Sequence, residues 1–172
     1  MNREGEEKIN NLYKIEKALR EADKRIIEVG GVEYSETSNS YTLLNSHGLK
    51  LSQKSNYYVY SAQTIAKEGE QTKSGYDVFA DNDFSKFSVE ELVKNTIRKT
   101  VSQLGGEACD TGVYKAVLSP DVVSSLLSAY LDNASAEEVQ KKSSLFIGKL
   151  GQKVASSKGT IEDRPLDKTL FG

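Results

Sequence analysis

Residues 112–151 read GVYKAVLSPDVVSSLLSAYLDNASAEEVQKKSSLFIGKLG, and this stretch shows the plan of the fold most directly. The apolar run at residues 114–118 predicts a short buried strand. Ser119 then supplies a side-chain oxygen that can cap a helix, and Pro120 suits the first helical position. Apolar residues follow at helical spacing, so one face of the predicted helix is apolar: Val122, Val123, Leu126, Leu127, Tyr130 and Leu131. A second short helix is predicted at residues 136–140, capped by Ser135.

The N-terminal region predicts a long amphipathic helix. From Ile9 the apolar positions advance in steps of three and four, through Leu12, Ile15, Leu19, Ala22 and Ile26, and charged residues occupy the other positions. Gly30 and Gly31 are expected to end this helix.

Residues 32–81 have the alternation and turn residues of β-structure. Turns are predicted at residues 38–40 and at Gly75, and a hairpin is predicted around residues 45–48. The strands at residues 57–65 and 76–80 then complete an antiparallel sheet. Ser88 is expected to cap a further helix, whose buried face is Val89, Leu92, Val93, Ile97, Val101 and Leu104. The expected fold class is α+β: an antiparallel sheet packed by amphipathic helices, followed by an opening strand–helix unit.

The polar stretch after Gly106 separates two predicted units. Residues 1–110 are expected to form the helix and antiparallel-sheet domain, and residues 111–172 are expected to begin a second, C-terminal domain. At 172 residues the chain is long enough for one sizeable core, or for one domain and the start of another.

Composition excludes several classes of function. The net charge is −2, with 23 basic and 25 acidic residues, and no clustered basic face points to a nucleic-acid partner. No apolar run reaches the ~20 residues that span a bilayer, so no membrane partner is expected. A lone cysteine cannot form an internal disulfide, which fits a reducing compartment. The expected location is the cytoplasm.

Few residues are candidates for chemistry. His47 is the only histidine, which rules out any site built from several histidines within these residues. Cys109 is interpreted as a small half-buried residue near a turn, the alternative being a reactive thiol. The tyrosines of residues 57–60 are interpreted as strand formers in a half-buried sheet, with a peptide-binding groove as the alternative.

Four segments resemble the TldD/PmbA family, whose members were first described as modulators of DNA gyrase. They are VLSPDVVSSLLSAYLDNAS (117–135), KKSSLFIGKLGQKVASSKGTIEDRP (141–165), EADKRI (21–26) and LLNSHGLKL (43–51). Within the last of these, Asn45, Ser46 and Gly48 match the family's Asn-Ser-x-Gly turn. The resemblance implies that this turn lies at a cleft or interface and that residues 160–163 form the next strand. The chain ends well short of the family's usual length, so a fragment or an unusually short member is expected, with a truncated C-terminal domain.

The resemblance also distinguishes two kinds of subunit. TldD-like subunits carry a His-Glu-x-x-x-His motif on the helix after the predicted strand, where two histidines grip zinc and the glutamate activates water. The corresponding helix here, residues 122–132, contains no histidine, cysteine or glutamate. The resemblance therefore implies the PmbA, or TldE, branch. Such a chain has no catalytic and no metal residues of its own. It pairs with a TldD-like zinc subunit that hydrolyses unfolded or short peptides.

Two other functions stay open at this point. The chain could be a self-contained α+β binding or structural module with no protease role, and a neighbouring gene with the zinc motif would argue against that. An enzyme acting through a serine, a lysine or Cys109 alone has no supporting motif.

Overall fold

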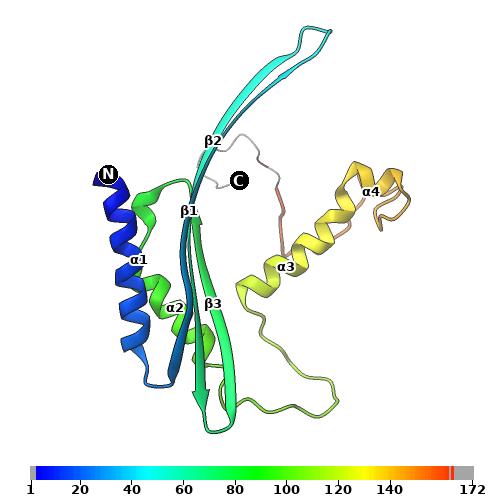
Figure 1. Ribbon diagram of the computed structural model, residues 1–172. Helices are drawn as coiled ribbons and strands as arrows, with labels where there is room; N and C mark the ends of the chain where they lie inside the picture. Colours follow the sequence, from blue (N-terminus) through cyan, green and yellow to red (C-terminus); the bar gives the residue numbers. More distant parts are fainter. Residues whose placement is uncertain (1–2, 163, 165–172) are drawn as a thin grey trace. The chain divides into compact units, whose positions relative to one another are not determined.

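The computed structural model describes residues 3–162 and residue 164. Contacts within the chain divide it into two units, of which the first ends at Ala108 and the second begins at Cys109. In the first unit, strands β1 (Ile26–Leu44), β2 (Lys50–Glu68) and β3 (Gln71–Asp81) form one antiparallel sheet in the order β1-β2-β3 (Figure 1). The predicted α+β class is confirmed.

Two helices cover one face of this sheet. They are α1 (Arg3–Ala22) and α2 (Val89–Val101), and both lie on the same side of the strands in Figure 1. Along β2, Tyr60, Ala62, Thr64 and Ala66 alternate toward the helices and are buried, as expected for a strand with one covered face. Ile15 and Leu19 of α1 and Leu92 of α2 complete the core. We call this side of the sheet the helix face and the other side the open face.

Aromatic rings close one end of the core. The short helix η1 (Phe84–Lys86) follows β3, and the Phe87 ring stacks on the Tyr60 ring with centroids 4.0 Å apart. Phe79 and Phe84 contact the same pair at centroid distances of 5.2 and 6.2 Å. The contacts of Phe79 and Phe84 fall within the centroid range of about 4.5–7 Å in which aromatic pairs add to the energy of simple burial, and the Tyr60–Phe87 pair is closer.

A close approach of α2 to the sheet depends on Gly75. A Cβ at this position would lie 2.6 Å from Thr100 Oγ1 and 2.7 Å from the Thr100 Cα and backbone nitrogen. Thr100 is fully buried, its hydroxyl lies 2.7 Å from the Thr64 hydroxyl, and it donates to the Thr96 carbonyl at 2.8 Å. The buried face of α2 therefore contains hydrogen-bonded threonines where the sequence predicted only aliphatic residues. Leu104 was predicted on that face, but it lies beyond the end of α2.

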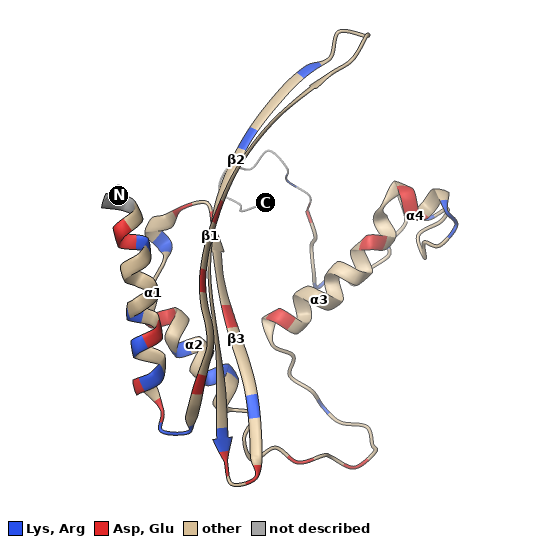
Figure 2. Cartoon of the chain, in the orientation of Figure 1, with Lys and Arg blue, Asp and Glu red and all other residues tan. Residues whose placement is uncertain are grey.

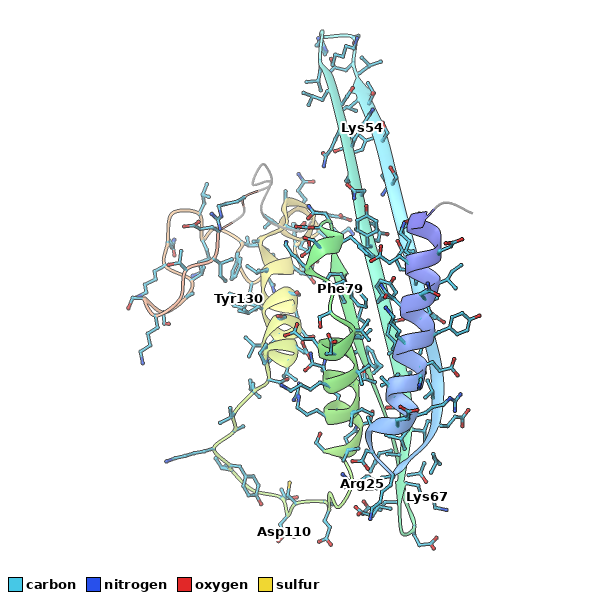
Figure 3. The ribbon with its side chains drawn as sticks, turned by 90° about the vertical axis from the view of Figure 1, so that its left-hand side faces the viewer. Arg25, Lys54, Lys67, Phe79, Asp110 and Tyr130 are labelled. Atoms are coloured by element: carbon cyan, nitrogen blue, oxygen red, sulfur yellow. The ribbon has the colours of Figure 1, made fainter. Side chains whose placement is uncertain are left out.

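β1 and β2 extend well beyond both helices as a two-stranded arm (Figure 1). We define the arm as residues 37–57. Its strands stay in unbroken register from Thr37 opposite Tyr57 to Leu44 opposite Lys50. Lys54 lies on the arm, whereas Arg25 and Lys67 lie at the opposite end of the sheet (Figure 3). Because the helices do not reach the arm, both its faces are exposed over most of their length.

Three helix starts agree with the sequence prediction. The hydroxyls of Ser88, Ser119 and Ser135 each accept a hydrogen bond from a backbone N–H in the first turn of α2, α3 and α4, respectively. Each capping residue has extended backbone angles, as a helix N-cap requires.

The predicted end of the first helix is wrong. α1 ends at Ala22, and Ile26 begins β1. Asp23 makes the turn, since its Oδ1 accepts from the Arg25 N–H at 2.9 Å and its carbonyl accepts from the Ile26 N–H at 3.0 Å. Gly30 and Gly31 lie inside β1, where the pairing with β2 shifts register between Val29 and Gly31.

Two predicted turns are also wrong. Ser38, Asn39 and Ser40 lie inside β1 and pair with β2, so the continuous ladder overrides their local turn preference. Gly75 lies inside β3, and the chain reverses instead at Gly69, whose φ is +57°. Glycine at position 75 serves helix packing rather than a turn.

The second unit contains helices α3 (Pro120–Leu131) and α4 (Ala136–Gln140), joined by the short helix η2 (Asp132–Ala134). The Tyr130 ring meets Phe146 edge-on at 5.2 Å, and the Asn133 carbonyl accepts from Ser144 Oγ. Residues 114–118, which were predicted to form a strand, are not in a strand, and the described sheet consists of β1, β2 and β3. Residues 160–162 are not a strand either, and Asp163 lies outside the described residues. No helix in the described part of the chain is long and apolar enough to cross a membrane.

Candidate functional site: the arm and the open face of the sheet

The predicted family turn lies at the end of the arm. Asn45 Oδ1 accepts hydrogen bonds from the backbone N–H groups of His47 and Leu49, both at 3.0 Å. Gly48 has φ +87°, a left-handed conformation that glycine adopts without strain. Asn45 and Gly48 thus shape the turn, while Ser46 and His47 are exposed on it. The structure places the matched residues together at the most projecting point of the sheet.

The two faces of the arm differ in chemistry. Residues paired across an antiparallel ladder share a face, so Leu43 with Leu51 and Tyr41 with Gln53 continue the open face of the sheet. The neighbouring pair, Leu44 with Lys50, continues the helix face together with Lys54. These two lysines are the only charged residues of the arm, and they account for its two blue bands in Figure 2.

The open face carries several exposed apolar side chains. Tyr76 and Val78 of β3 are 66% and 47% exposed, and Tyr41, Leu43 and Leu51 of the arm are 52–57% exposed. Large apolar side chains on one continuous face mark an interaction surface more often than scattered ones do.

A hollow lies in the middle of this open face. It has a volume of about 360 Å³ and is lined by Gly30, Gly31, Glu33, Ser61, Ala62, Gln63, Tyr76 and Val78. Gly30 and Gly31 have no side chains to fill this space, and a Cβ on Gly31 would meet nothing within 4 Å. A larger groove of about 780 Å³ lies between α1 and the segment 84–94, over the aromatic end of the core.

A polar cluster holds α1 against the base of the arm. Glu36 Oε2 accepts from Lys8 Nζ at 2.5 Å and from the Tyr34 hydroxyl at 2.6 Å. The bond from Lys8 lowers the pKa of Glu36, and burial together with the bond to Glu36 raises the pKa of Tyr34 to about 12. Lys8 Nζ also lies over the Tyr34 and Tyr58 rings at 5.4 and 5.7 Å from their centroids. These contacts join α1 to β1 next to the base of the arm.

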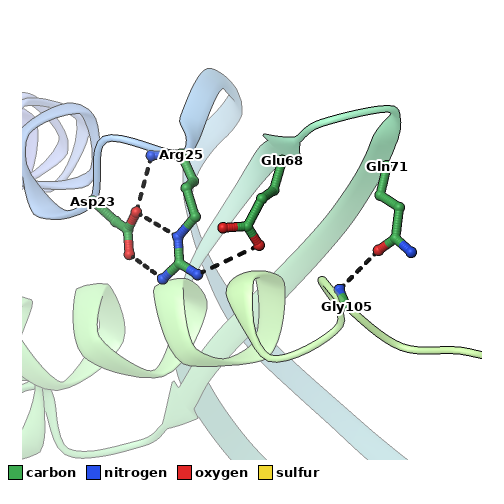
Figure 4. A network of polar contacts seen from close by, with 5 residues as sticks. All are labelled: Asp23, Arg25, Glu68, Gln71 and Gly105. Carbon is green, nitrogen blue, oxygen red and sulfur yellow. Dashed lines mark hydrogen bonds and ion pairs between the residues drawn. The ribbon is translucent and has the colours of Figure 1, made fainter.

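A second polar network closes the opposite end of the sheet (Figure 4). Asp23 binds the Arg25 guanidinium through both its oxygens, at 3.0 and 2.7 Å, and Arg25 lies 3.9 Å from Glu68. Gln71 accepts from the Gly105 N–H at 2.8 Å and so ties the chain after α2 to β3. The hydrogen bonds from Arg25 lower the pKa of Asp23 to about 2.

Asp23→Asn should make stability less dependent on pH in the acid range. Because the pKa of Asp23 is lower in the folded state, its stabilisation is present above about pH 4 and is lost as the pH falls toward 2. We expect the variant to be less stable than the original chain by roughly 1 kcal/mol at pH 6. That difference should shrink toward zero at pH 2 in thermal melts. Asp110→Asn is the control, and a constant difference for Asp23→Asn across this range would contradict the assignment.

The candidates for catalysis belong to different units of the chain. His47 lies at the arm tip of the first unit, whereas Cys109 is an exposed residue at the start of the second. Cys109 is therefore not the half-buried residue that the sequence predicted. Tyr60 belongs to the core and does not line a groove. Among residues 3–162 and 164, no group of three or more His, Cys, Asp or Glu side chains could hold a metal ion.

Comparisons with known proteins identify the class of protein. Residues 2–104 match the PmbA/TldA metallopeptidase central domain, and residues 111–172 match the PmbA/TldA metallopeptidase C-terminal domain. The two matched domains follow one another along this chain and are the central and C-terminal domains of the same family. The chain belongs to the PmbA/TldA metallopeptidase family.

Two curated relatives carry the PmbA name. The chain is 26% identical over 151 residues to the metalloprotease PmbA homolog of Haemophilus influenzae, covering 87% of this chain and 34% of that protein. It is 24% identical over 161 residues to metalloprotease PmbA of Escherichia coli O157:H7, covering 93% and 36%. The chain thus spans about a third of the length of these relatives.

Solved structures share the fold. A candidate modulator of DNA gyrase from Bacteroides thetaiotaomicron has a TM-score of 0.80 and 26% identity, over 91% of this chain and 35% of its own. TldE from Thermococcus kodakarensis has a TM-score of 0.61 and 20% identity, over 82% of this chain and 32% of its own. Together with the family match, these similarities fit a partial PmbA/TldE-like chain.

Proposed function

We propose that this chain is part of a PmbA/TldE-like subunit that holds no metal and works with a TldD-like zinc subunit in the hydrolysis of unfolded or short peptides. The observation that carries the proposal is the chemistry of α3. In TldD-like members the corresponding helix supplies two histidines and a glutamate, but α3 here, PDVVSSLLSAYL, contains no histidine and no glutamate. The family membership supports a peptidase-related role, and α3 supports the metal-free branch.

The donor set does not fit zinc. Zinc sites in proteins are built mainly from cysteine sulfur and histidine nitrogen, usually with three or four protein ligands. This sequence contains one histidine and one cysteine, His47 and Cys109, and they belong to different units. The proposed contribution of this chain is therefore to form walls and interfaces around the peptide. A cytoplasmic location is part of the same proposal.

Within this proposal, the turn at the arm tip meets the peptide or the zinc subunit. Asn45 and Gly48 are used to shape the turn, and Ser46 is exposed on it. A projecting turn whose backbone is fixed by its own hydrogen bonds is a suitable contact, because less conformational entropy is lost when it docks.

The test is hydrolysis of a fluorescence-quenched peptide by three samples: this chain, the TldD-like protein of the same genome, and their mixture. We expect the mixture to hydrolyse faster than the two separate rates added together. A zinc chelator should abolish the activity, and added zinc should restore it. Asn45→Ala should lower the rate of the mixture severalfold, while Asn56→Ala, the same change in the shaft of the arm, should not.

Three results would contradict the proposal. Hydrolysis by this chain alone would show catalytic groups that the structure does not assemble. A mixture that neither associates nor gains activity would favour the alternative, a self-contained binding or structural module. If Asn45→Ala and Asn56→Ala lowered the rate of hydrolysis equally, the turn would not be a specific contact with the peptide or the zinc subunit.

A further inference from the structure

We propose that Lys8 is a clamp that fixes the direction of the arm: its side chain ties α1 to the row of the sheet from which the arm projects. Two observations carry this inference, namely the place where the sheet narrows from three strands to two and the contacts that converge on Lys8 there. All of these contacts lie within the first unit of the chain. The inference does not rest on the proposed role in peptide hydrolysis, because it concerns the conformation of this chain alone.

The sheet narrows at one row of paired residues. Glu36 of β1 pairs with Tyr58 of β2, and Tyr58 pairs in turn with Asp81, the last residue of β3. From Thr37 and Tyr57 outward, β1 and β2 pair with each other without β3. Two-stranded ribbons twist more than wider sheets and are marginally stable on their own. The direction of the arm therefore depends on how its base is held.

Lys8 contacts both strands at this base. Its Nζ donates to Glu36 Oε2 at 2.5 Å and lies 5.7 Å from the centroid of the Tyr58 ring. Tyr34 and Tyr60 form the next row on the same face of the sheet, because residues two apart on a strand share a face. Lys8 Nζ lies 5.4 Å from the centroid of the Tyr34 ring, and the Lys8 carbonyl accepts from the Tyr60 hydroxyl at 3.4 Å. One residue of α1 thus contacts two rows where the arm begins.

The contacts of Lys8 with Glu36 and the rings require its positive charge. The ammonium group donates to the Glu36 carboxylate, and a cation over a tyrosine ring is attracted by the negative charge of the ring face. The Tyr34 hydroxyl fixes the same carboxylate oxygen at 2.6 Å, while on the β2 side the Phe84 ring meets the Tyr58 ring edge-on at 5.5 Å. The Lys8 and Glu36 side chains are 19% and 53% exposed, so their pair adds little to global stability. Its effect is on the position of β1 relative to α1.

The experiment measures the distance between two spin labels in the 172-residue chain by double electron–electron resonance. One label is attached at Ser46→Cys on the arm tip and the other at Tyr13→Cys, an exposed position on α1. The exposed native thiol is removed by Cys109→Ser. We expect a narrow distance distribution for this labelled parent chain. Lys8→Met should widen the distribution at least about twofold, because methionine keeps an apolar stem but cannot bind Glu36 or attract the rings as a cation.

Further variants separate the charge of Lys8 from its other properties. Lys8→Arg should keep the narrow distribution, because a guanidinium group can bind Glu36 and lie over the same rings. Glu36→Gln should widen the distribution as Lys8→Met does, and the double variant should widen it no further than either change alone. Lys17→Met is the matched control, the same change at an exposed lysine further along α1. All these variants should keep the circular dichroism spectrum of the labelled parent chain.

Several outcomes would overturn the inference. One is a distribution for Lys8→Met and Glu36→Gln that is as narrow as that of the labelled parent chain, since the arm would then be held without the clamp. Another is equal widening in Lys17→Met, or widening in Lys8→Arg as large as in Lys8→Met. A broad distribution in the labelled parent chain would show that the arm has no fixed direction. Loss of the circular dichroism spectrum in Lys8→Met would assign Lys8 to folding rather than to the arm.

Discussion

Tyr60→Ala should lower the free energy of unfolding by about 3–5 kcal/mol, the range for truncating a large buried aromatic residue. Tyr60 is fully buried, and its ring stacks on Phe87 at 4.0 Å and lies 4.7 Å from Tyr34. Its hydroxyl also donates to the Lys8 carbonyl at 3.4 Å, so it joins β2 to α1. Alanine would leave a cavity at the point where strands, helices and η1 meet.

Urea unfolding followed by circular dichroism at 222 nm measures this effect. The control is Tyr13→Ala on α1, where the tyrosine is 68% exposed and the change should stay within about 0.5 kcal/mol. A loss below about 1 kcal/mol for Tyr60→Ala would mean that Tyr60 is not at the centre of the core.

Gly75→Ala should destabilise the fold by about 1–3 kcal/mol or more, although it adds a single methyl group. The new Cβ would lie 2.7 Å from backbone atoms of Thr100, so a change of side-chain rotamer cannot relieve the clash. Either α2 moves away from β3 or the strand bends. Movement of α2 would also disturb the bond between Lys99 Nζ and Asp77 Oδ1, which measures 2.8 Å.

The same unfolding measurement tests this prediction, with Gly31→Ala as the control because that Cβ meets nothing within 4 Å. The double variant Gly75→Ala, Thr100→Ala separates two causes. If the clash were with the hydroxyl alone, the second change would restore stability. We expect no recovery, because the backbone contact remains. A Gly75→Ala chain as stable as the Gly31→Ala chain would contradict the close approach.

Tyr60 and Gly75 show how the two faces of the sheet differ. The residues of the helix face pack against the helices: Tyr60 fills the centre of the core, and Gly75 lets α2 lie close to β3. The open face does not pack against α1 or α2, and there Gly30 and Gly31 leave a hollow beside Tyr76 and Val78. Packing therefore accounts for the covered side of the sheet and places no such constraint on the open face or the arm.

Local signals in the sequence were sufficient for several elements. Ser88 and Ser119 begin their helices as predicted, because an N-cap needs only a side-chain oxygen and the next few backbone N–H groups. The hairpin at Asn45 could be predicted for a similar reason, because the hydrogen bonds to Asn45 Oδ1 come from backbone N–H groups two and four residues away. The sequence alone also shows that residues 122–132 contain no His-Glu-x-x-x-His motif.

Other elements could not be predicted because distant segments decide them. Ser38 and Asn39 favour turns, but β2 supplies a complete set of hydrogen-bond partners and keeps them extended. Ile26 continues the helical spacing of α1 by coincidence, and the turn at Asp23 ends the helix earlier. Residues 114–118 have the composition of a strand but are not in one, because a strand forms only when a neighbouring segment supplies its hydrogen bonds, and composition does not reveal that neighbour.

The sequence by itself determined the α+β class, the capped helices, the hairpin turn with Asn45 and Gly48, and the lack of a zinc-binding set on α3. Each depends on residue type or on contacts a few positions apart. Only the tertiary structure decided the length of the arm, the role of Gly75, the hydrogen-bonded threonines under α2 and the apolar open face. These features arise from strand register and helix docking, which join residues tens of positions apart and set which side of each strand is covered.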